Sequence, residues 1–91
     1  MSIVETNVTI TNRVGLHARP ARLLVQTAAQ FQSQIQLRHG DKTANAKSIV
    51  GVLKLGAVMG DMLLFHAEGE DAEKALDALT NLALRNFDEQ E

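Results

Sequence analysis

The apolar pattern changes its period across one short junction, and this change constrains the fold more than any other feature. Before the junction, Val8 and Ile10 alternate with threonines, which is the two-residue period of a strand. After it, apolar residues recur every three to four positions, which is the period of an amphipathic helix. The sequence therefore predicts a strand over residues 3–11 that passes through a short turn into a helix beginning at Ala18.

The predicted helix has both a clear beginning and a clear buried face. Pro20 lies in the first turn, where the missing N–H of proline removes no helical hydrogen bond. The expected core-facing stripe is Ala21, Leu24, Val25 and Ala28, and Phe31 is expected to continue it one turn later.

The rest of the chain repeats these two patterns. Alternating segments predict strands over residues 34–38, 42–46 and 62–68, with a turn at Gly40 and Asp41 between the first two. A short helix is predicted from Ser48 to residue 55. The last helix is expected to follow Asp71 as its N-cap. Three inward strand residues are expected at Leu63, Phe65 and Ala67, and the stripe of the last helix at Ala72, Ala75, Leu76, Leu79, Leu82 and Ala83.

The element order is thus β-α-β-β-α-β-α in a single domain of residues 1–91. Strands with one polar face and helices with one apolar stripe favour a two-layer α+β domain. We expect an antiparallel sheet covered by helices on one face and open to water on the other. The acidic tail, residues 88–91, is expected to fray.

Composition excludes several classes of function. The formal net charge is −2 and only three residues are aromatic, which disfavours nucleic-acid binding. Cysteine is absent, so disulfides, thiolate chemistry and thiolate metal sites are excluded. No basic leader or membrane-length apolar run is present, which predicts a cytoplasmic protein. His39 and His66 are expected to be solvated surface residues, and no zinc site is predicted.

The junction carries most of the functional information. At a helix N-terminus the first N–H groups, here those of Ala18 and Arg19, have no acceptor within the helix, and the helix dipole favours an anion. The Arg19 guanidinium can contact the same anion. His17 stands at the N-cap, and a neutral imidazole can take and pass on a phosphoryl group. The residues therefore suit a reversible phosphohistidine site.

Chemistry alone leaves a simpler interpretation open. A histidine next to an arginine at the start of a helix is common on protein surfaces. From the residue types and their spacing, an ordinary surface loop that contains His17 and Arg19 is about as well supported as a phosphoryl site.

Two motifs resemble those of HPr, the histidine-containing phosphocarrier of the bacterial sugar phosphotransferase system. The first runs Gly15-Leu16-His17-Ala18-Arg19-Pro20-Ala21, and the second runs Asn45-Ala46-Lys47-Ser48-Ile49-Val50-Gly51-Val52. The resemblance covers nearly the whole chain and continues at Leu55-Gly56 and Ala67-Glu68-Gly69.

The resemblance implies specific roles. His17 resembles the phosphorylated histidine of the family, and Arg19 the arginine that contacts the phosphoryl group. The family fold is an open-faced β-sandwich of four antiparallel strands and three helices. The resemblance implies a monomeric carrier, not an enzyme and without a cofactor, that accepts phosphate from enzyme I and delivers it to enzyme IIA. In some members a carboxylate near the C-terminus approaches the arginine, but Asp88, Glu89 and Glu91 are assigned no such role.

Ser48 has two compatible roles. Its position before an apolar helical run predicts an N-cap. The resemblance implies regulatory phosphorylation by HPr kinase/phosphorylase, with a catabolite-control transcription factor as a further partner. The apolar residues expected to dock partners are Leu16, Val50, Leu53 and Leu55; for Leu53 and Leu55, core packing is an equally good interpretation.

Other functions remain as alternatives. A catabolite-regulatory module acting mainly through Ser48 is one, although the presence of His17 argues against it. A carrier for the nitrogen-related phosphotransferase branch or for dihydroxyacetone kinase would use the same His17 chemistry with different partners. A small-molecule-binding α+β regulatory domain would leave the arrangement around His17 unexplained and ranks last.

Overall fold

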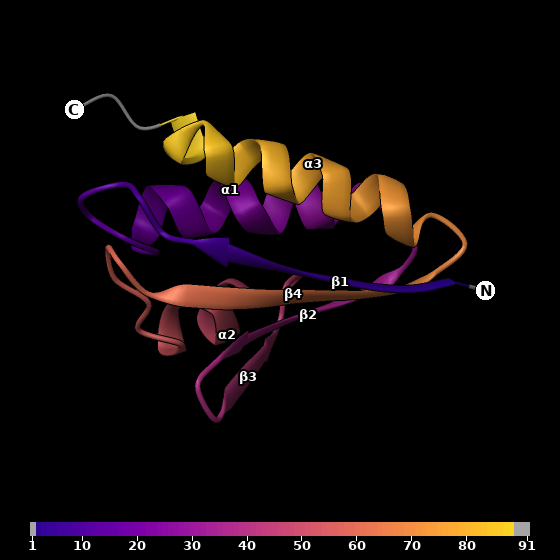
Figure 1. Ribbon diagram of the computed structural model, residues 1–91, viewed down its shortest axis with the longest axis horizontal. Coiled ribbons are helices and arrows are strands. Elements are labelled where there is room, and N and C mark those ends of the chain that lie inside the picture. Colours follow the sequence, from indigo (N-terminus) through magenta and orange to yellow (C-terminus); the bar gives the residue numbers. More distant parts are fainter. Residues whose placement is uncertain (1, 89–91) are drawn as a thin grey trace.

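The computed structural model describes residues 2–88 and confirms the predicted element order (Figure 1). The elements follow one another as strand, helix, two strands, helix, strand and helix, and a short 3₁₀ turn ends the described chain. Their bounds are β1 Ser2–Thr9, α1 Ala18–Ala28, β2 Gln34–His39, β3 Lys42–Asn45, α2 Ile49–Lys54, β4 Met62–Gly69, α3 Ala72–Leu84 and η1 Asn86–Asp88.

The four strands form one sheet in the order β1-β4-β2-β3, and all neighbours are antiparallel. Val8 pairs with Leu63, and Phe65 pairs with Leu37. This register places inward residues of adjacent strands on the same face. The long, central β4 is thus buried through Leu63, Phe65 and Ala67, as the alternation predicted.

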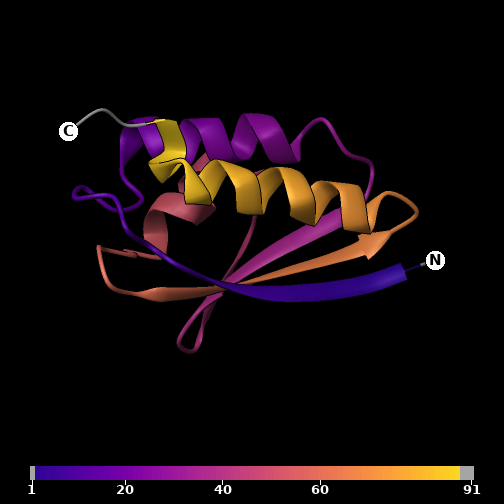
Figure 2. The same cartoon turned by 45° about the horizontal axis from the view of Figure 1, so that its top comes forward.

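Helices cover only one face of this sheet, so the expected open-faced α+β architecture is confirmed. Helices α1 and α3 lie side by side on the same side of the strands (Figure 2). The shorter α2 contacts α1 and β3. The predicted stripe of α3 is entirely buried, and Ala21, Leu24 and Ala28 of α1 are buried against the same core.

Phe31 does not continue helix α1, contrary to the prediction. The helix ends at Ala28 with Ala29 as its C-cap. The next two amides bond three residues back: Gln30 N–H donates to Thr27 O and Phe31 N–H to Ala28 O, each at 3.2 Å. This tightening of the last turn takes Phe31 off the helical path and leaves it half-buried beside the core.

The first strand ends at Thr9, two residues before the predicted end. Ile10 bonds to the loop before β4 instead of continuing the ladder. Its N–H donates to Asp61 O, and its carbonyl accepts from Gly60 N–H, both at 2.8 Å. Ile10 is 1% exposed, so the chain leaves the sheet while remaining in the core.

Asp71 occupies the predicted N-cap position of α3, but its side chain makes no capping hydrogen bond. The carboxylate instead accepts from the Gln32 and Ser33 amides, each at 2.9 Å, and from the Ser33 hydroxyl. These hydrogen bonds, led by that of the Ser33 hydroxyl, lower the pKa of Asp71. The residue therefore joins the start of α3 to the segment between α1 and β2.

The described chain ends in the 3₁₀ turn η1, which the sequence pattern did not predict. Phe87 is 1% exposed and has a left-handed backbone, with φ of +54°. Asp88, predicted to belong to the fraying tail, lies in this turn, and its carboxylate accepts from Arg85 Nε at 2.9 Å. The remaining tail residues of the fraying prediction, 89–91, lie outside the described residues. Within residues 2–88, no helix has the length and apolarity needed to cross a membrane.

Candidate functional site

His17 is the N-cap of α1. Its backbone is extended, with φ −108° and ψ −165°, and its carbonyl accepts the first helical hydrogen bond from Ala21 N–H at 2.9 Å. Pro20 is buried in the first turn, as predicted. The His17 side chain makes no capping hydrogen bond, although most N-cap side chains are used in that way. Its imidazole is exposed at the helix start.

Gly15 allows the junction to pack tightly against the loop before β4. Its φ is +65°, and a Cβ atom would lie 2.6 Å from Ala57 O and 2.7 Å from Val58 Cα. Both neighbours are backbone atoms, so they cannot turn away as a side chain could. Next in the chain, Leu16 N–H donates to Ala57 O at 3.0 Å. Only glycine fits this approach, which fixes the chain two residues before His17.

Asn12 stabilises the same turn from inside. Its side chain is fully buried, and Nδ2 donates to Gly15 O at 2.9 Å. Oδ1 has no hydrogen-bond partner within residues 2–88. The change of period predicted only a short turn here and gave Asn12 no role. The signal that could have found its role is an asparagine three residues before a glycine, a spacing that suits a side-chain-capped turn.

The junction presents a compact polar surface. His17, Ala18 and Arg19 are all exposed, and they lie at the first turn of an eleven-residue helix. This places a nucleophilic ring and a guanidinium at the positive end of the helix dipole. The arrangement can hold a tetrahedral anion on or beside the imidazole. Leu16, which was expected to dock partners, is 3% exposed and belongs to the core instead.

Ser48 is the N-cap of α2, as predicted. Its Oγ accepts from Gly51 N–H at 3.1 Å. A Cβ on Gly51 would lie 3.3 Å from that oxygen, so the glycine leaves space beside the hydroxyl. Ser48 is half-buried.

The predicted docking residues divide into two groups. Val50 and Leu53 are 59% and 41% exposed, whereas Leu55 is 1% exposed and packs in the core. Leu55 ends α2 as its C-cap, where its side chain turns inward, so core packing, the second of its two interpretations, fits its position. Ile49, which precedes Val50 on α2, is also 39% exposed.

Three further exposed apolar residues border the junction, and sequence reasoning missed them. Val14 is 45%, Val58 57% and Met59 56% exposed. The first precedes Gly15, and the other two belong to the loop that packs on it. We call the combined set of exposed residues the apolar rim: Val14, Ile49, Val50, Leu53, Val58 and Met59.

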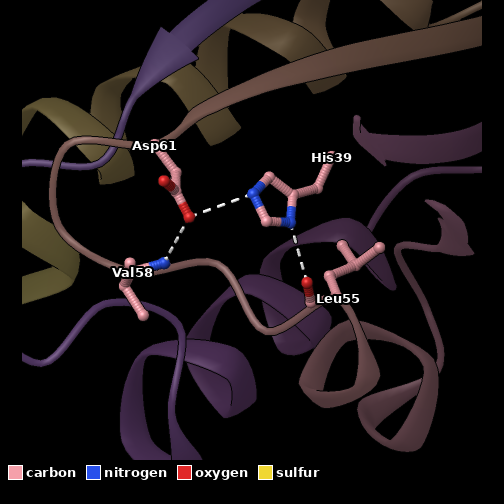
Figure 3. Close-up of polar contacts among 4 residues, drawn as sticks. All are labelled: His39, Leu55, Val58 and Asp61. Atoms are coloured by element: carbon pink, nitrogen blue, oxygen red, sulfur yellow. Dashed lines mark hydrogen bonds and ion pairs between the residues drawn. The ribbon is translucent and has the colours of Figure 1, made fainter. Parts of the chain in front are cut away.

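His39 and His66 are not simply solvated, contrary to the prediction. His39 Nδ1 lies 2.8 Å from Leu55 O, and Nε2 lies 3.0 Å from Asp61 Oδ2 (Figure 3). His66 Nδ1 lies 2.7 Å from Glu5 Oε2 on β1. About a quarter of each side chain is exposed, 27% and 28% respectively. Among residues 2–88, no cluster of three or more histidine and acidic side chains is arranged to bind a metal ion.

Comparison with known proteins extends beyond the His17 motif. A family model described as the PTS HPr component phosphorylation site matches residues 4–84. The chain is 42% identical over 89 residues to phosphocarrier protein NPr of Shewanella violacea, which covers 98% of both chains. It is 41% identical over 87 residues to phosphocarrier protein HPr of Xylella fastidiosa strain Temecula1, covering 96% of this chain and 98% of the relative.

The fold also matches that of a solved structure closely. The crystal structure of HPr-C-His from Thermoanaerobacter tengcongensis superposes with a TM-score of 0.93 at 45% sequence identity, and the match covers 97% of this chain and 99% of the other. The sequence similarity and the structural similarity therefore both extend over almost the entire chain.

Proposed function

The chain belongs to the HPr family of phosphotransferase-system phosphocarriers, and we propose that it carries a phosphoryl group on His17 from enzyme I to enzyme IIA as a monomeric cytoplasmic protein. The observation that carries this proposal is the exposed His17 ring at the start of α1, which makes no capping hydrogen bond.

The proposed reaction exchanges one phosphorus–nitrogen bond for another. A lone pair on the His17 imidazole attacks the phosphorus of a phosphohistidine on enzyme I. The bond to the donor nitrogen breaks as the bond to His17 forms, so the phosphoryl group moves without oxidation or reduction. A second exchange of the same kind passes it to enzyme IIA. The protein is a carrier in this scheme, because each turnover requires a partner at both steps.

The helix start stabilises the phosphorylated form. Three groups favour added negative charge there: the first N–H groups of α1, including that of Ala18, the helix dipole, and the guanidinium of Arg19. Their combined effect must stay modest. A phosphoryl group that was held too tightly would not be passed on, and an exposed site in water meets this requirement.

The apolar rim supports docking of the two protein partners. Its six residues come from the segment before Gly15, the loop that packs on Gly15, and α2, which contacts α1. Exposed apolar side chains beside a charged reactive group provide burial energy for a short-lived complex. The proposed docking residues of the original prediction are thus restricted to Val50 and Leu53.

Ser48 is the proposed regulatory position. Its hydroxyl already accepts from Gly51 N–H at the start of α2, and a phosphate at a helix N-terminus is electrostatically favourable. Phosphorylation by an HPr kinase/phosphorylase would place this charge two residues from Val50, in the apolar rim. We expect it to weaken partner docking there and to favour binding of a catabolite-control transcription factor.

The test is a reconstituted relay. The protein is mixed with phosphoenolpyruvate and enzyme I, and enzyme IIA is then added. We expect acid-labile phosphate to appear on this chain and then on enzyme IIA. Exposed Arg22, one turn further along α1, provides a control: Arg22→Ala should retain the relay, whereas His17→Ala should stop it. A relay that continues without His17 would contradict the proposal.

The similarity to NPr of Shewanella violacea, at 42% identity, supports a second candidate: a carrier for the nitrogen-related phosphotransferase branch. Both candidates use His17, and they differ in the donor. Initial rates of phosphorylation by enzyme I of the sugar branch and by its nitrogen-branch counterpart, measured under the same conditions, distinguish them. A faster rate with the nitrogen-branch donor would reverse our order.

A further inference from the structure

His39 joins the two ends of one loop. The loop spans residues 56–61, between α2 and β4, and Figure 3 shows His39 reaching it from the end of β2. Nδ1 lies 2.8 Å from the carbonyl of Leu55, immediately before the loop. A carbonyl oxygen only accepts, so Nδ1 donates in this contact when it carries a proton. Nε2 lies 3.0 Å from Oδ2 of Asp61, the last residue of the loop.

Asp61 also holds the loop together internally. Its Oδ2, which faces His39, accepts from Val58 N–H at 2.9 Å, and its own N–H donates to Val58 O at 2.9 Å. One carboxylate oxygen therefore joins the end of β2 to the middle of the loop. Two interactions of His39 and two of Asp61 hold a segment that contains glycine at both residue 56 and residue 60.

The loop supports both ends of the segment that leads to His17. At one end, Ile10 exchanges two backbone hydrogen bonds of 2.8 Å with Gly60 and Asp61. At the other end, Ala57 O accepts from Leu16 N–H at 3.0 Å, and the loop backbone packs directly on Gly15. The position of the His17 backbone thus depends on the position of the 56–61 loop.

We propose that His39 and Asp61 are positioning residues for phosphoryl transfer at His17, acting through the 56–61 loop. This inference rests on the proposed function. Neither residue touches the phosphoryl group. They hold the loop whose Ala57 carbonyl sets the direction in which the chain enters α1. In-line transfer between two nitrogens is sensitive to such placement, since reacting atoms must be aligned at close approach.

A matched control exists elsewhere in the molecule. His66 also pairs with a carboxylate, Glu5, at 2.7 Å, and its side chain has nearly the same exposure as that of His39, 28% against 27%. It joins β4 to β1 and has no contact with the 56–61 loop among the interactions described. Loss of either pair should destabilise the fold similarly, but only loss of the His39–Asp61 pair should affect His17.

The kinetic test measures phosphorylation of the protein by phosphorylated enzyme I, with this chain as the varied substrate. For His39→Ala and Asp61→Ala we expect kcat to fall roughly three- to tenfold, since intermittent misplacement costs less than a permanent shift. KM should change less, within about twofold, because the apolar rim also includes Val14 and three residues of α2, which lie outside the loop. Asp61→Asn keeps an oxygen that can accept from Val58 N–H, so it should recover most of the rate. His66→Ala should match the unmodified protein.

A second readout does not require transfer at all. Hydrogen exchange of the Leu16 amide reports its bond to Ala57 O. We expect exchange to accelerate in His39→Ala and Asp61→Ala but not in His66→Ala. An unchanged kcat, a rise in KM alone, or an unchanged Leu16 exchange rate would each overturn the inference. Failure of the proposed function itself looks different, because the unmodified protein would then take no phosphate on His17.

Discussion

Helices α1 and α2 begin in different ways, although both N-cap residues have an extended backbone. Ser48 uses its side chain to accept from Gly51 N–H at 3.1 Å, which satisfies one of the first amides of α2. His17 makes no such bond and leaves its ring exposed at the start of α1. The start of α2 is stabilised by its own N-cap side chain. The start of α1 is stabilised from outside, by Asn12, Gly15 and Ala57.

This difference separates stability from chemistry. The Ser48 hydroxyl contributes a hydrogen bond to its own helix, whereas the His17 imidazole contributes none. At α1 the stabilising hydrogen bonds come from the preceding turn and from the neighbouring loop. The N-cap side chain is therefore available for reaction. Substitution of Arg19 at the start of α1 should therefore lower the rate of phosphoryl transfer more than the stability. Substitution of Ser48 at the start of α2 should lower the stability more than the rate.

The largest effect is expected for Gly15→Ala, which would disrupt the start of α1 and leave α2 intact. Left-handed strain and a collision with the Ala57 and Val58 backbone together should cost roughly 2–6 kcal/mol of unfolding free energy. Gly56→Ala is the control, because Gly56 has a similar φ of +63° with nothing within 4 Å of its Cβ position. Denaturant unfolding of both variants measures the difference. Equal losses would show that close packing at Gly15 is unimportant.

Arg19→Ala should affect transfer far more than stability. The loss of a charge-assisted contact to a phosphoryl group corresponds to about 1.5–3 kcal/mol, or roughly a 10- to 150-fold lower rate of phosphoryl transfer. Arg19→Lys should lie between, since it keeps the charge but not the planar fork. Stopped-flow or quench-flow labelling compares these variants with Arg22→Ala. If Arg22→Ala is equally slow, the effect is one of general charge and not of the helix start.

Ser48→Ala should show the reverse profile. Removal of the capping hydroxyl should cost about 1 kcal/mol, while phosphorylation of His17 stays within about twofold of the unmodified protein. Ser48→Thr keeps the hydroxyl and should retain most of the stability. Thermal unfolding measures the loss of stability, and the labelling assay on the same samples measures the rate of His17 phosphorylation. A Ser48→Ala variant with full stability would mean that the hydrogen bond to Gly51 contributes nothing.

The smallest effect is expected at the third helix start. Hydrogen bonds from Ser33 and Gln32 lower the pKa of Asp71 in the folded protein. A carboxyl group whose pKa is lower when folded stabilises the protein above its unfolded pKa, which is near 3.8, and this stabilisation disappears as pH falls through the lower folded value. Asp71→Asn should therefore destabilise the protein at neutral pH and hardly at all in strong acid. Denaturant unfolding of both proteins from neutral pH to strong acid tests this prediction. A difference in unfolding free energy that does not change with pH would contradict it.

The sequence was sufficient for the features that depend on local patterns. Period and turn residues predicted the four strands, the three α-helices, the sheet face formed by Leu63, Phe65 and Ala67, and the capping role of Ser48, but not the 3₁₀ turn η1. These features follow from residues near one another in the chain. The HPr resemblance added the identity of the family, which the matched family model confirms.

Most of the errors share a physical cause, which is contact between residues far apart in the sequence. The early end of α1 before Phe31 is instead a local effect. Leu16 and Leu55 have no local signal that separates a core leucine from a docking one, and only the packing of the 56–61 loop decides. His39 and Asp61 are 22 positions apart, and Asp71 reaches Ser33 across 38 positions. Short-range periodicity cannot predict such pairs. Of the two pairs, His39–Asp61 is the one proposed to hold the start of α1 in place.

The most direct measurement of the central claim is site mapping of phosphate after incubation with phosphoenolpyruvate and enzyme I. Peptides are analysed by mass spectrometry without acid treatment. The chain has three histidines, so His39 and His66 serve as internal controls. We predict one acid-labile phosphate, on His17, and its complete loss in a His17→Ala variant whose unfolding free energy stays within about 0.5 kcal/mol of the unmodified protein. Acid-labile phosphate on another histidine, or label that persists in the folded His17→Ala variant, would contradict the account.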